Sequence, residues 1–325
     1  MDLKQASKKA VEQCMGIKNQ EEVLIIYDES TKNIAESLQE SSKIITSTKT
    51  MDLDEFRPIL ELPNKIMDLV KKSDVVMLII RKKMGEDEFR SKIKNYCFDN
   101  KIRFVLSADM TEKIFIHGMK ADYNTIKNIS NKVLNQVENA KKIKITTKKG
   151  TDLTISLSDN NWVATYGDYS TTDQQGSNLP SGEVFTWPKK VDGIAIIDGI
   201  LGSHFSKKYG LLYGKSLKLT IVDSFIQEVE CQDKRLERDF KKYIEIDENS
   251  KRINELGIGT NIGIKKLFGI MVNDEKMPGV HIAIGNPCPN TCKKDIKSKV
   301  HCDMIMLKAS IDVENKTIMK EGRFI

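Results

Sequence analysis

Two side chains that can bind a metal lie two residues apart near the C-terminal end of the chain. His301 and Asp303 belong to an apolar run, Val300–Met306, which predicts a β-strand. In a strand, residues i and i+2 point to the same face, so the imidazole and the carboxylate would project together. Cys302 would then point to the opposite face. With only four histidines in the chain, this pair is a candidate half of a metal site.

Three further segments contain candidate ligands. Glu183 follows a Pro-Ser-Gly turn and precedes a short apolar strand that ends at Pro188. Glu255 precedes two glycines, which let the backbone turn or approach another group closely. His281 stands near the start of an apolar strand. Taken singly, each has an ordinary explanation: an exposed turn glutamate, a solvated acid beside a glycine-rich turn, and a hydrogen-bonded core histidine.

Taken together, these residues predict a metal centre. Two histidines and three carboxylates supply nitrogen and oxygen ligands suited to Zn²⁺, Mn²⁺, Co²⁺ or Fe²⁺. They are enough to hold two divalent ions with one carboxylate bridging. Two such ions, about 3.5–4 Å apart, can activate water and polarise the carbonyl that it attacks.

A structural zinc site is the alternative. Its ligands would be Cys288, Cys292, His301 and Cys302, and the spacing of the first two suits zinc. The last two are adjacent, however, and would point to opposite faces of a strand. The carboxylate-rich site is therefore favoured.

The elements that must position these residues begin with a region of alternating strands and helices. Continuous apolar runs at Val23–Tyr27, Val75–Ile80 and 104–106 predict buried strands, and Ile44–Ile45 could begin another. Helix-like segments separate them, which favours a mainly parallel sheet with helices on its faces. No glycine-rich phosphate loop follows the first two runs, so no nucleotide site is predicted. We interpret this region as structural, substrate-shaping or involved in assembly.

Beyond a long helix-like segment over 122–141, the pattern changes to alternating strands. A hairpin is predicted around Lys149–Thr151, and further strands follow. We therefore predict an α/β protein with an N-terminal α/β domain over residues 1–125. A β-rich α+β catalytic domain that binds the metals would span residues 126–325.

Composition limits the possible partners and location. The chain has 52 basic and 46 acidic residues, a net charge of +6, and its lysines are spread widely. We see no nucleic-acid-binding module, and no apolar run approaches the ~20 residues of a membrane-spanning helix. The N-terminus is polar and unlike a signal peptide. We expect a cytoplasmic protein, without nucleic-acid or membrane partners, whose six cysteines are free thiols.

The four segments, in this order, resemble the metal-dependent aminopeptidase family typified by aminopeptidase T and aminopeptidase S. Its Pro-Ser-Gly-Glu-Val-Phe-Thr-x-Pro segment is matched by Pro180–Pro188, and its glutamate before a Gly-x-Gly-Thr-Asn-like turn by Glu255–Asn261. Its Val-His-Ile-Ala-x-Gly strand is matched by Val280–Gly285, and its late His-x-Asp pair by His301 and Asp303. The match covers roughly residues 140–310.

The resemblance implies a function and a set of ligands. It implies hydrolysis of N-terminal residues from peptides, two divalent metal ions per chain (Zn²⁺, Co²⁺ or Mn²⁺) and a homodimer. Glu255 is our choice for the carboxylate that also handles protons. The family's tyrosine after the His-Ile-Ala strand has no counterpart in 286–290. The implied metal ligands are Glu183, Glu255, His281, His301 and Asp303.

Two other functions stay open. The ring-cleaving 2,5-dihydroxypyridine dioxygenases resemble the same family and use a two-histidine, one-carboxylate Fe²⁺ centre, which here would be His281, His301 and Asp303. The presence of Glu183 and Glu255 favours hydrolysis over this alternative. A diverged protein that binds metal without catalysis is the third hypothesis.

Overall fold

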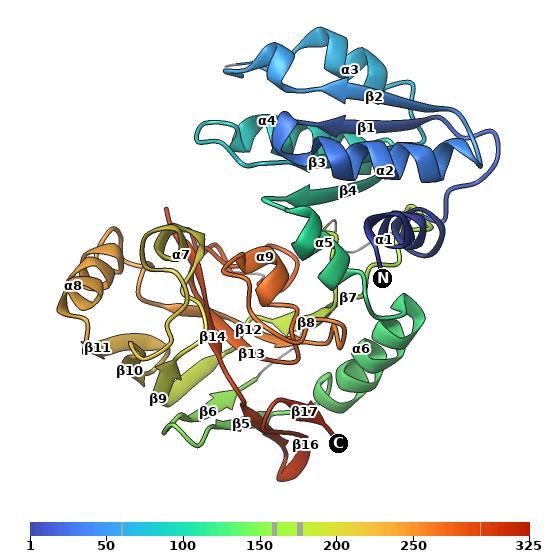
Figure 1. Cartoon of the computed structure of the whole chain (residues 1–325). Coiled ribbons are helices and arrows are strands. Elements are labelled where there is room, and N and C mark those ends of the chain that lie inside the picture. Colours follow the sequence, from blue (N-terminus) through green and yellow to red (C-terminus); the bar gives the residue numbers. More distant parts are fainter. Residues whose placement is uncertain (60, 158–160, 174–177, 293) are drawn as a thin grey trace. The chain divides into compact units, whose positions relative to one another are not determined.

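The computed structural model shows two compact units (Figure 1). The first consists of residues 1–127 and 167–181, and the second of residues 128–166 and 182–325. Within the described part of the chain, no helix has both the length and the apolar character needed to cross a membrane. The structure describes residues 1–59, 61–157, 161–173, 178–292 and 294–325.

The first unit contains the predicted parallel sheet. Its four strands are β1 (Val23–Tyr27), β2 (Thr48–Asp52), β3 (Val75–Ile80) and β4 (Arg103–Ala108), in the order β2-β1-β3-β4. The continuous apolar run of β3 is buried along its whole length, as a strand covered on both faces requires. One boundary was predicted wrongly. Ile44 does not begin a strand but follows the end of a helix, where its side chain is 82% exposed.

Helices cover both faces of this sheet. They are α1 (Leu3–Lys9), continued by a π-helical turn over Ala10–Cys14, then α2 (Lys32–Lys43), α3 (Asn64–Val70), α4 (Asp87–Asp99) and α5 (Glu112–Gly118). Helix α2 contacts β1, β2, α1 and α5. Residues of α3 and α4, among them Ile66 and Ile93, share a core with Leu24 and Leu78. Alternate residues of each strand thus serve the two helical layers.

At the carboxyl ends of β1 and β3, a buried arginine forms ion pairs with the chain's own acids. Arg57 contacts Asp28 at 2.8 Å and Glu86 at 2.9 Å, and its side chain is only 6% exposed. The backbone N–H of Arg81, which follows β3, donates to Asp28 at 2.7 Å. Sheets of this kind commonly bind ligands at this position. Here Arg57 and the two acids satisfy one another.

The second unit contains two antiparallel sheets. The larger has the order β11-β10-β9-β6-β5-β15-β16-β17, and the smaller has the order β14-β13-β12-β8-β7. Its helices are α6 (Tyr123–Val137), which begins in the first unit, α7 (Ser203–Tyr209), α8 (Lys234–Tyr243) and α9 (Met271–Asp274). The larger sheet consists of β5 (Lys142–Thr146), β6 (Asp152–Ser156), β9 (Lys190–Ile197), β10 (Leu217–Val222), β11 (Phe225–Cys231), β15 (Ser310–Val313), β16 (Lys316–Lys320) and β17 (Arg323–Phe324). The smaller sheet consists of β7 (Val163–Thr165), β8 (Glu183–Thr186), β12 (Ile253–Gly259), β13 (Gly279–Gly285) and β14 (His301–Met306).

One face of the five-stranded sheet packs into the main core of this unit. Leu256, Ile282 and Met304 are fully buried there and share a cluster with Leu153 and Leu219 of the larger sheet. Because side chains alternate along a strand, the residues between them project from the opposite face. That opposite face carries the candidate ligands, and we call it the ligand face.

The segment around Glu255 is a strand and not the glycine-rich turn that the sequence also allowed. Gly257 pairs with Phe185 of β8 on one side and with His281 of β13 on the other. Two flanking strands hold the segment extended, and its glycines serve the close approach of neighbouring groups instead of a turn. The predicted parallel sheet and β-rich half are both confirmed. The functional division at residue 125/126 stays a prediction.

Candidate metal centre

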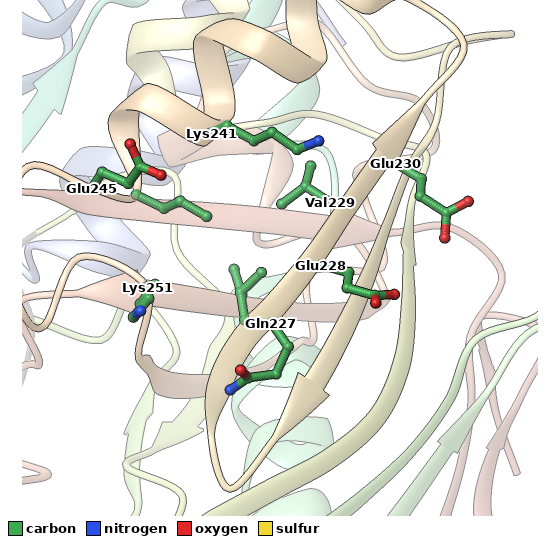
Figure 2. A pocket seen from close by; sticks show the side chains of 9 residues that line it. Gln227, Glu228, Val229, Glu230, Lys241, Glu245 and Lys251 are labelled. Carbon is green, nitrogen blue, oxygen red and sulfur yellow. The ribbon is translucent and has the colours of Figure 1, made fainter.

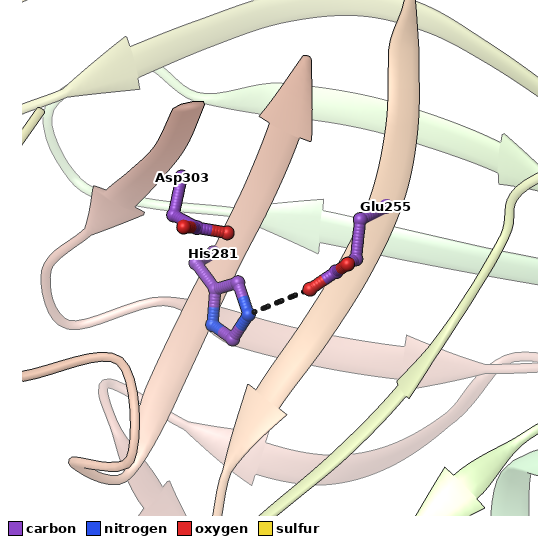
Figure 3. Close-up of side chains that lie close together, drawn as sticks. All are labelled: Glu255, His281 and Asp303. Carbon is purple, nitrogen blue, oxygen red and sulfur yellow. Dashed lines mark ion pairs between the residues drawn. The ribbon is translucent and has the colours of Figure 1, made fainter. Parts of the chain in front are cut away.

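Three neighbouring strands bring three candidate ligands together on the ligand face. Glu255 comes from β12, His281 from β13 and Asp303 from β14 (Figure 3). Ala283 lies opposite both Glu255 and Asp303 in the strand register, and His281 precedes Ala283 by two residues. The small Ala283 side chain leaves the carboxylates on either side facing a common space. One ligand atom from each of the three residues lies within 4.8 Å of the others.

The imidazole of His281 has an unsatisfied nitrogen. The residue is 1% exposed, and among the described residues Nε2 finds no partner with hydrogen-bond geometry. Glu255 Oε1 lies 3.5 Å away, near enough for electrostatic attraction. A buried nitrogen without a partner costs free energy unless a bound group satisfies it. The donor set and this orphaned atom therefore fit a divalent metal ion.

Charge in the centre also favours a cation. Burial lowers the pKa of the His281 imidazole, but Glu255, Glu183 and Asp303 outweigh burial and raise that pKa to about 9. Burial raises the pKa of the Asp303 carboxyl, but the neighbouring His301 overrides this effect and holds that pKa below its usual range. The same carboxylates that attract a proton to His281 would attract a metal ion.

Glu183 lies beside this group and is paired with a buried lysine. Its Oε2 is 3.8 Å from His281 Nε2, and its Oε1 accepts a short hydrogen bond from Lys276. Lys276 is 1% exposed and also contacts Glu275 Oε1 at 2.6 Å. Burial raises the pKa of Glu275 to about 7, although the lysine opposes that shift. Two carboxylates thus share one ammonium group next to the three clustered ligands.

Sequence reasoning missed Lys276 because a charged run usually marks a solvated surface. The segment between β12 and β13 delivers this lysine. Asp274 accepts backbone hydrogen bonds from Phe268, Gly269 and Ile270 and so closes the turn before it. The Asn261 N–H donates to the Lys276 carbonyl at 2.8 Å. These bonds are local, and only the folded sheet brings Glu183 to the ammonium group.

His301 lies at the open side of the centre. Its Nε2 is 3.3 Å from Asp303 Oδ1, and its Nδ1 is 2.8 Å from the Asn286 carbonyl. The side chain is 43% exposed, whereas that of Asp303 is 12% exposed. The negative charge of Asp303 raises the pKa of the His301 imidazole. Burial opposes this effect, but the net pKa is raised. The five predicted ligands thus lie close to one another, three of them in the tight cluster.

The cysteine alternative is not formed. Cys302 points away from His301 into the main core, as the strand alternation predicts. Cys292 is buried and Cys288 is partly buried. In the described ranges of the chain, Glu255, His281 and Asp303 are the only group of three or more histidine, cysteine or acidic residues close enough to hold a metal.

Comparison with known proteins decides the family. The family model described as thermophilic metalloprotease (M29) matches residues 119–324. The chain belongs to this family. Membership of the M29 family makes the chain a metallopeptidase by descent and implies the use of a divalent metal. The matched region includes every candidate ligand.

Solved structures share the M29 chain's fold. Wild-type AmpT from Thermus thermophilus has a TM-score of 0.65 at 16% identity, covering 99% of this chain and 98% of that one. A 2,5-dihydroxypyridine dioxygenase from Pseudomonas putida KT2440 has a TM-score of 0.73 at 15% identity, covering 99% and 96%. At such identities the likeness concerns the fold alone. A search of curated proteins finds no match.

Proposed function

We propose that this M29 protein is a metal-dependent aminopeptidase that removes N-terminal residues from peptides. The observation that supports it best is the buried cluster of Glu255, His281 and Asp303, whose ligand atoms lie within 4.8 Å of one another. Glu183 and His301 extend this cluster on two sides. They are the natural ligands for a second ion. When bound, divalent ions supply a hydroxide nucleophile at neutral pH and polarise the scissile carbonyl.

Glu255 is the carboxylate best suited to move a proton. Lys276 donates to Glu183, so that carboxylate is already committed to a buried cation. Among the described residues, the ion-pair partner of Glu255 is His281 alone, at 3.5 Å. Glu255 can therefore take a proton from the attacking water and return it to the leaving amine.

The charge of the ligand face suits a free α-amine. Four carboxylates, those of Glu183, Glu255, Glu275 and Asp303, outnumber the ammonium group of Lys276 and the two imidazoles of raised pKa, His281 and His301. A peptide's N-terminal ammonium would be attracted to such a surface, whereas an acetylated N-terminus would not. This preference separates an aminopeptidase from an endopeptidase.

Elemental analysis combined with a panel of aminoacyl-p-nitroanilides tests the proposal. We expect two divalent ions per chain and hydrolysis of the free-amine substrates but not of their N-acetylated counterparts. Glu183→Ala and His301→Ala should each abolish hydrolysis while the circular dichroism spectrum stays unchanged. Full activity in either variant would contradict the site assignment.

The same measurements separate the other functions. One Fe²⁺ per chain, with oxygen uptake on an aromatic diol, would support a dioxygenase. Metal binding without turnover on either substrate class would support a non-catalytic protein. The homodimer and the cytoplasmic location stay predictions, and light scattering of the purified chain tests the first.

A further inference from the structure

A cavity with a basic rim lies at one end of the ligand face. Its volume is about 480 Å³, and it is lined by Leu267, Leu307 and four cationic side chains. Leu307 follows β14 directly and is two residues from Ile305, so it continues the ligand face beyond the strand. Four other stretches of the second unit, at 213, 264–267, 277–278 and 321–323, meet the end of β14 here. The cationic residues are Lys265, Lys266, Lys308 and Arg323.

The cations of this cavity outnumber its acids. Glu321 is the one carboxylate among the described lining residues, and it pairs with Lys148 at 2.9 Å. The Lys148 ammonium is the main cause that lowers the pKa of Glu321, and the charge of Lys308 adds to this effect. Within the described ranges, none of the four lining cations forms an ion pair. The cavity therefore has an uncompensated positive charge above an apolar floor.

A second cavity provides the contrast. It measures about 450 Å³ and lies between β11 and α8 (Figure 2). Its lining carries Glu228, Glu230 and Glu245 against Lys241 and Lys251. Both signs are present, so this surface has no comparable attraction for an anion.

Backbone conformation is unusual at the rim of the basic cavity. Lys308 has φ +53° and Glu321 has φ +49°. Both values lie in the left-handed region, which side chains with a Cβ disfavour. Glycine would adopt these angles without strain, yet the chain has a lysine at position 308. The same conformation occurs at other turns, for example at Asp223 and Ser224, so its use here is to mark a position where glycine can replace lysine.

We propose that the basic cavity binds the C-terminal carboxylate of a short peptide. The identity of the ligand as a peptide rests on the proposed function. Recognition of a carboxylate rests on the unpaired cations, and recognition of an adjoining apolar side chain rests on Leu267 and Leu307.

The cavity is also connected to the candidate metal centre through shared packing. Leu267 packs with Ile305, and Ile305 pairs directly with His281 in the strand register. Leu307 lies four positions after Asp303, a distance of about 13 Å in an extended strand. Leu267 and Ile305 are both buried, so close packing of side chains links the cavity to the centre.

Binding of blocked peptides tests the proposal without any hydrolysis. The probes are N-acetylated Ala-Ala-Ala-Leu with a free C-terminus and the same peptide as its C-terminal amide, titrated into the full chain. We expect the free acid to bind at least about fivefold more tightly at low ionic strength. The double variant Lys265→Ser/Lys266→Ser should lose this preference. Lys251→Ser/Lys316→Ser removes two exposed lysines outside the cavity and should keep it.

A second variant guards against misfolding. Lys308→Gly removes a rim cation at a position that glycine adopts without strain, so Tm should stay within about 2 °C of wild type while the acid preference falls. Equal binding of acid and amide by wild type, or a preference that survives both cavity variants, would overturn the proposal. Binding of the blocked probes does not depend on hydrolysis. If the chain prefers the free acid but does not hydrolyse free-amine substrates, the proposed function is refuted and the cavity assignment stands.

Discussion

Gly257 lies directly opposite His281 in the β12–β13 pair, and a Cβ atom at position 257 would come within 2.0 Å of His281 Nε2. The imidazole therefore lies across the neighbouring strand, over the place where a side chain would otherwise stand. This is why a glycine in the middle of a buried strand, normally unfavourable, is needed here. The glycine sets the direction of Nε2 toward Glu255.

Gly257→Ala should weaken metal binding without unfolding the second unit. The added methyl group must displace the imidazole, so we expect the affinity for Zn²⁺, measured by calorimetric titration, to fall at least about tenfold. Gly279→Ala is the matched control, because a Cβ there meets its nearest atom at 3.7 Å, an ordinary contact. Unchanged affinity in the Gly257 variant would show that His281 is not a ligand.

Lys276→Met should destabilise the protein strongly. The variant leaves Glu183 and Glu275 without the buried ammonium that both contact, and breaking a buried ion pair in this way costs about 3–5 kcal/mol. Urea denaturation measures the change in the free energy of unfolding. Adding Glu275→Gln removes one of the stranded charges and should recover part of the loss. If the single variant is as stable as wild type, the ammonium does not stabilise this face.

Much of the fold follows from local sequence patterns. The run Val75–Ile80 has no polar residue and forms a fully buried parallel strand. The alternation in His301–Met306 puts Cys302 in the core and Asp303 on the ligand face, as the period of two requires. Such patterns depend on neighbouring residues only, so a single sequence contains them.

Long-range pairing explains what the sequence did not predict. Lys276 contacts Glu183 across 93 residues, and nothing near either residue signals the other. The segment after Glu255 could also be interpreted as a turn, because its glycines are compatible with a turn and with a closely packed strand. The reason for Gly257 becomes visible only when β13 lies beside β12. The period of two placed His301 and Asp303 on one face, and the resemblance to a family implied the full ligand set. The surroundings of these ligands depend on the strand register.

Metal binding should stabilise the protein, and its removal should reverse the effect. A ligand that binds only the folded state at about 100 times its Kd adds about 2.7 kcal/mol to the free energy of unfolding. We expect Zn²⁺ at that level to raise Tm and a chelator to lower it again. Glu255→Gln removes one charged ligand and should abolish most of the shift, whereas Glu228→Gln, in the charge-mixed cavity, should leave it unchanged. An equal Tm shift in both variants would place the ion elsewhere.

The approach to β14 should loosen in acid. Asp247 accepts a hydrogen bond from the Lys299 N–H at 2.7 Å and another from Ser298 Oγ at 2.9 Å, just before His301. The Lys299 bond is the main cause that lowers the pKa of Asp247. A lowered folded-state pKa means that the stabilisation is complete above the unfolded pKa, about 3.9. It is lost as the pH falls through that value toward the lower folded-state pKa.

Hydrogen exchange of the Lys299 amide measures this anchoring. Corrected for intrinsic exchange rates, its protection should fall as the pH drops below about 4. Asp247→Ala should produce the same loss at pH 7, because the acceptor is removed outright. Asp295→Ala is the matched control, since its partner Lys297, 3.1 Å away, is 83% exposed and anchors nothing. If the Lys299 amide is as protected in both variants as in wild type, Asp247 does not anchor the start of β14. The backbone pairing of β13 with β14 alone must then hold the strand of His301 in register.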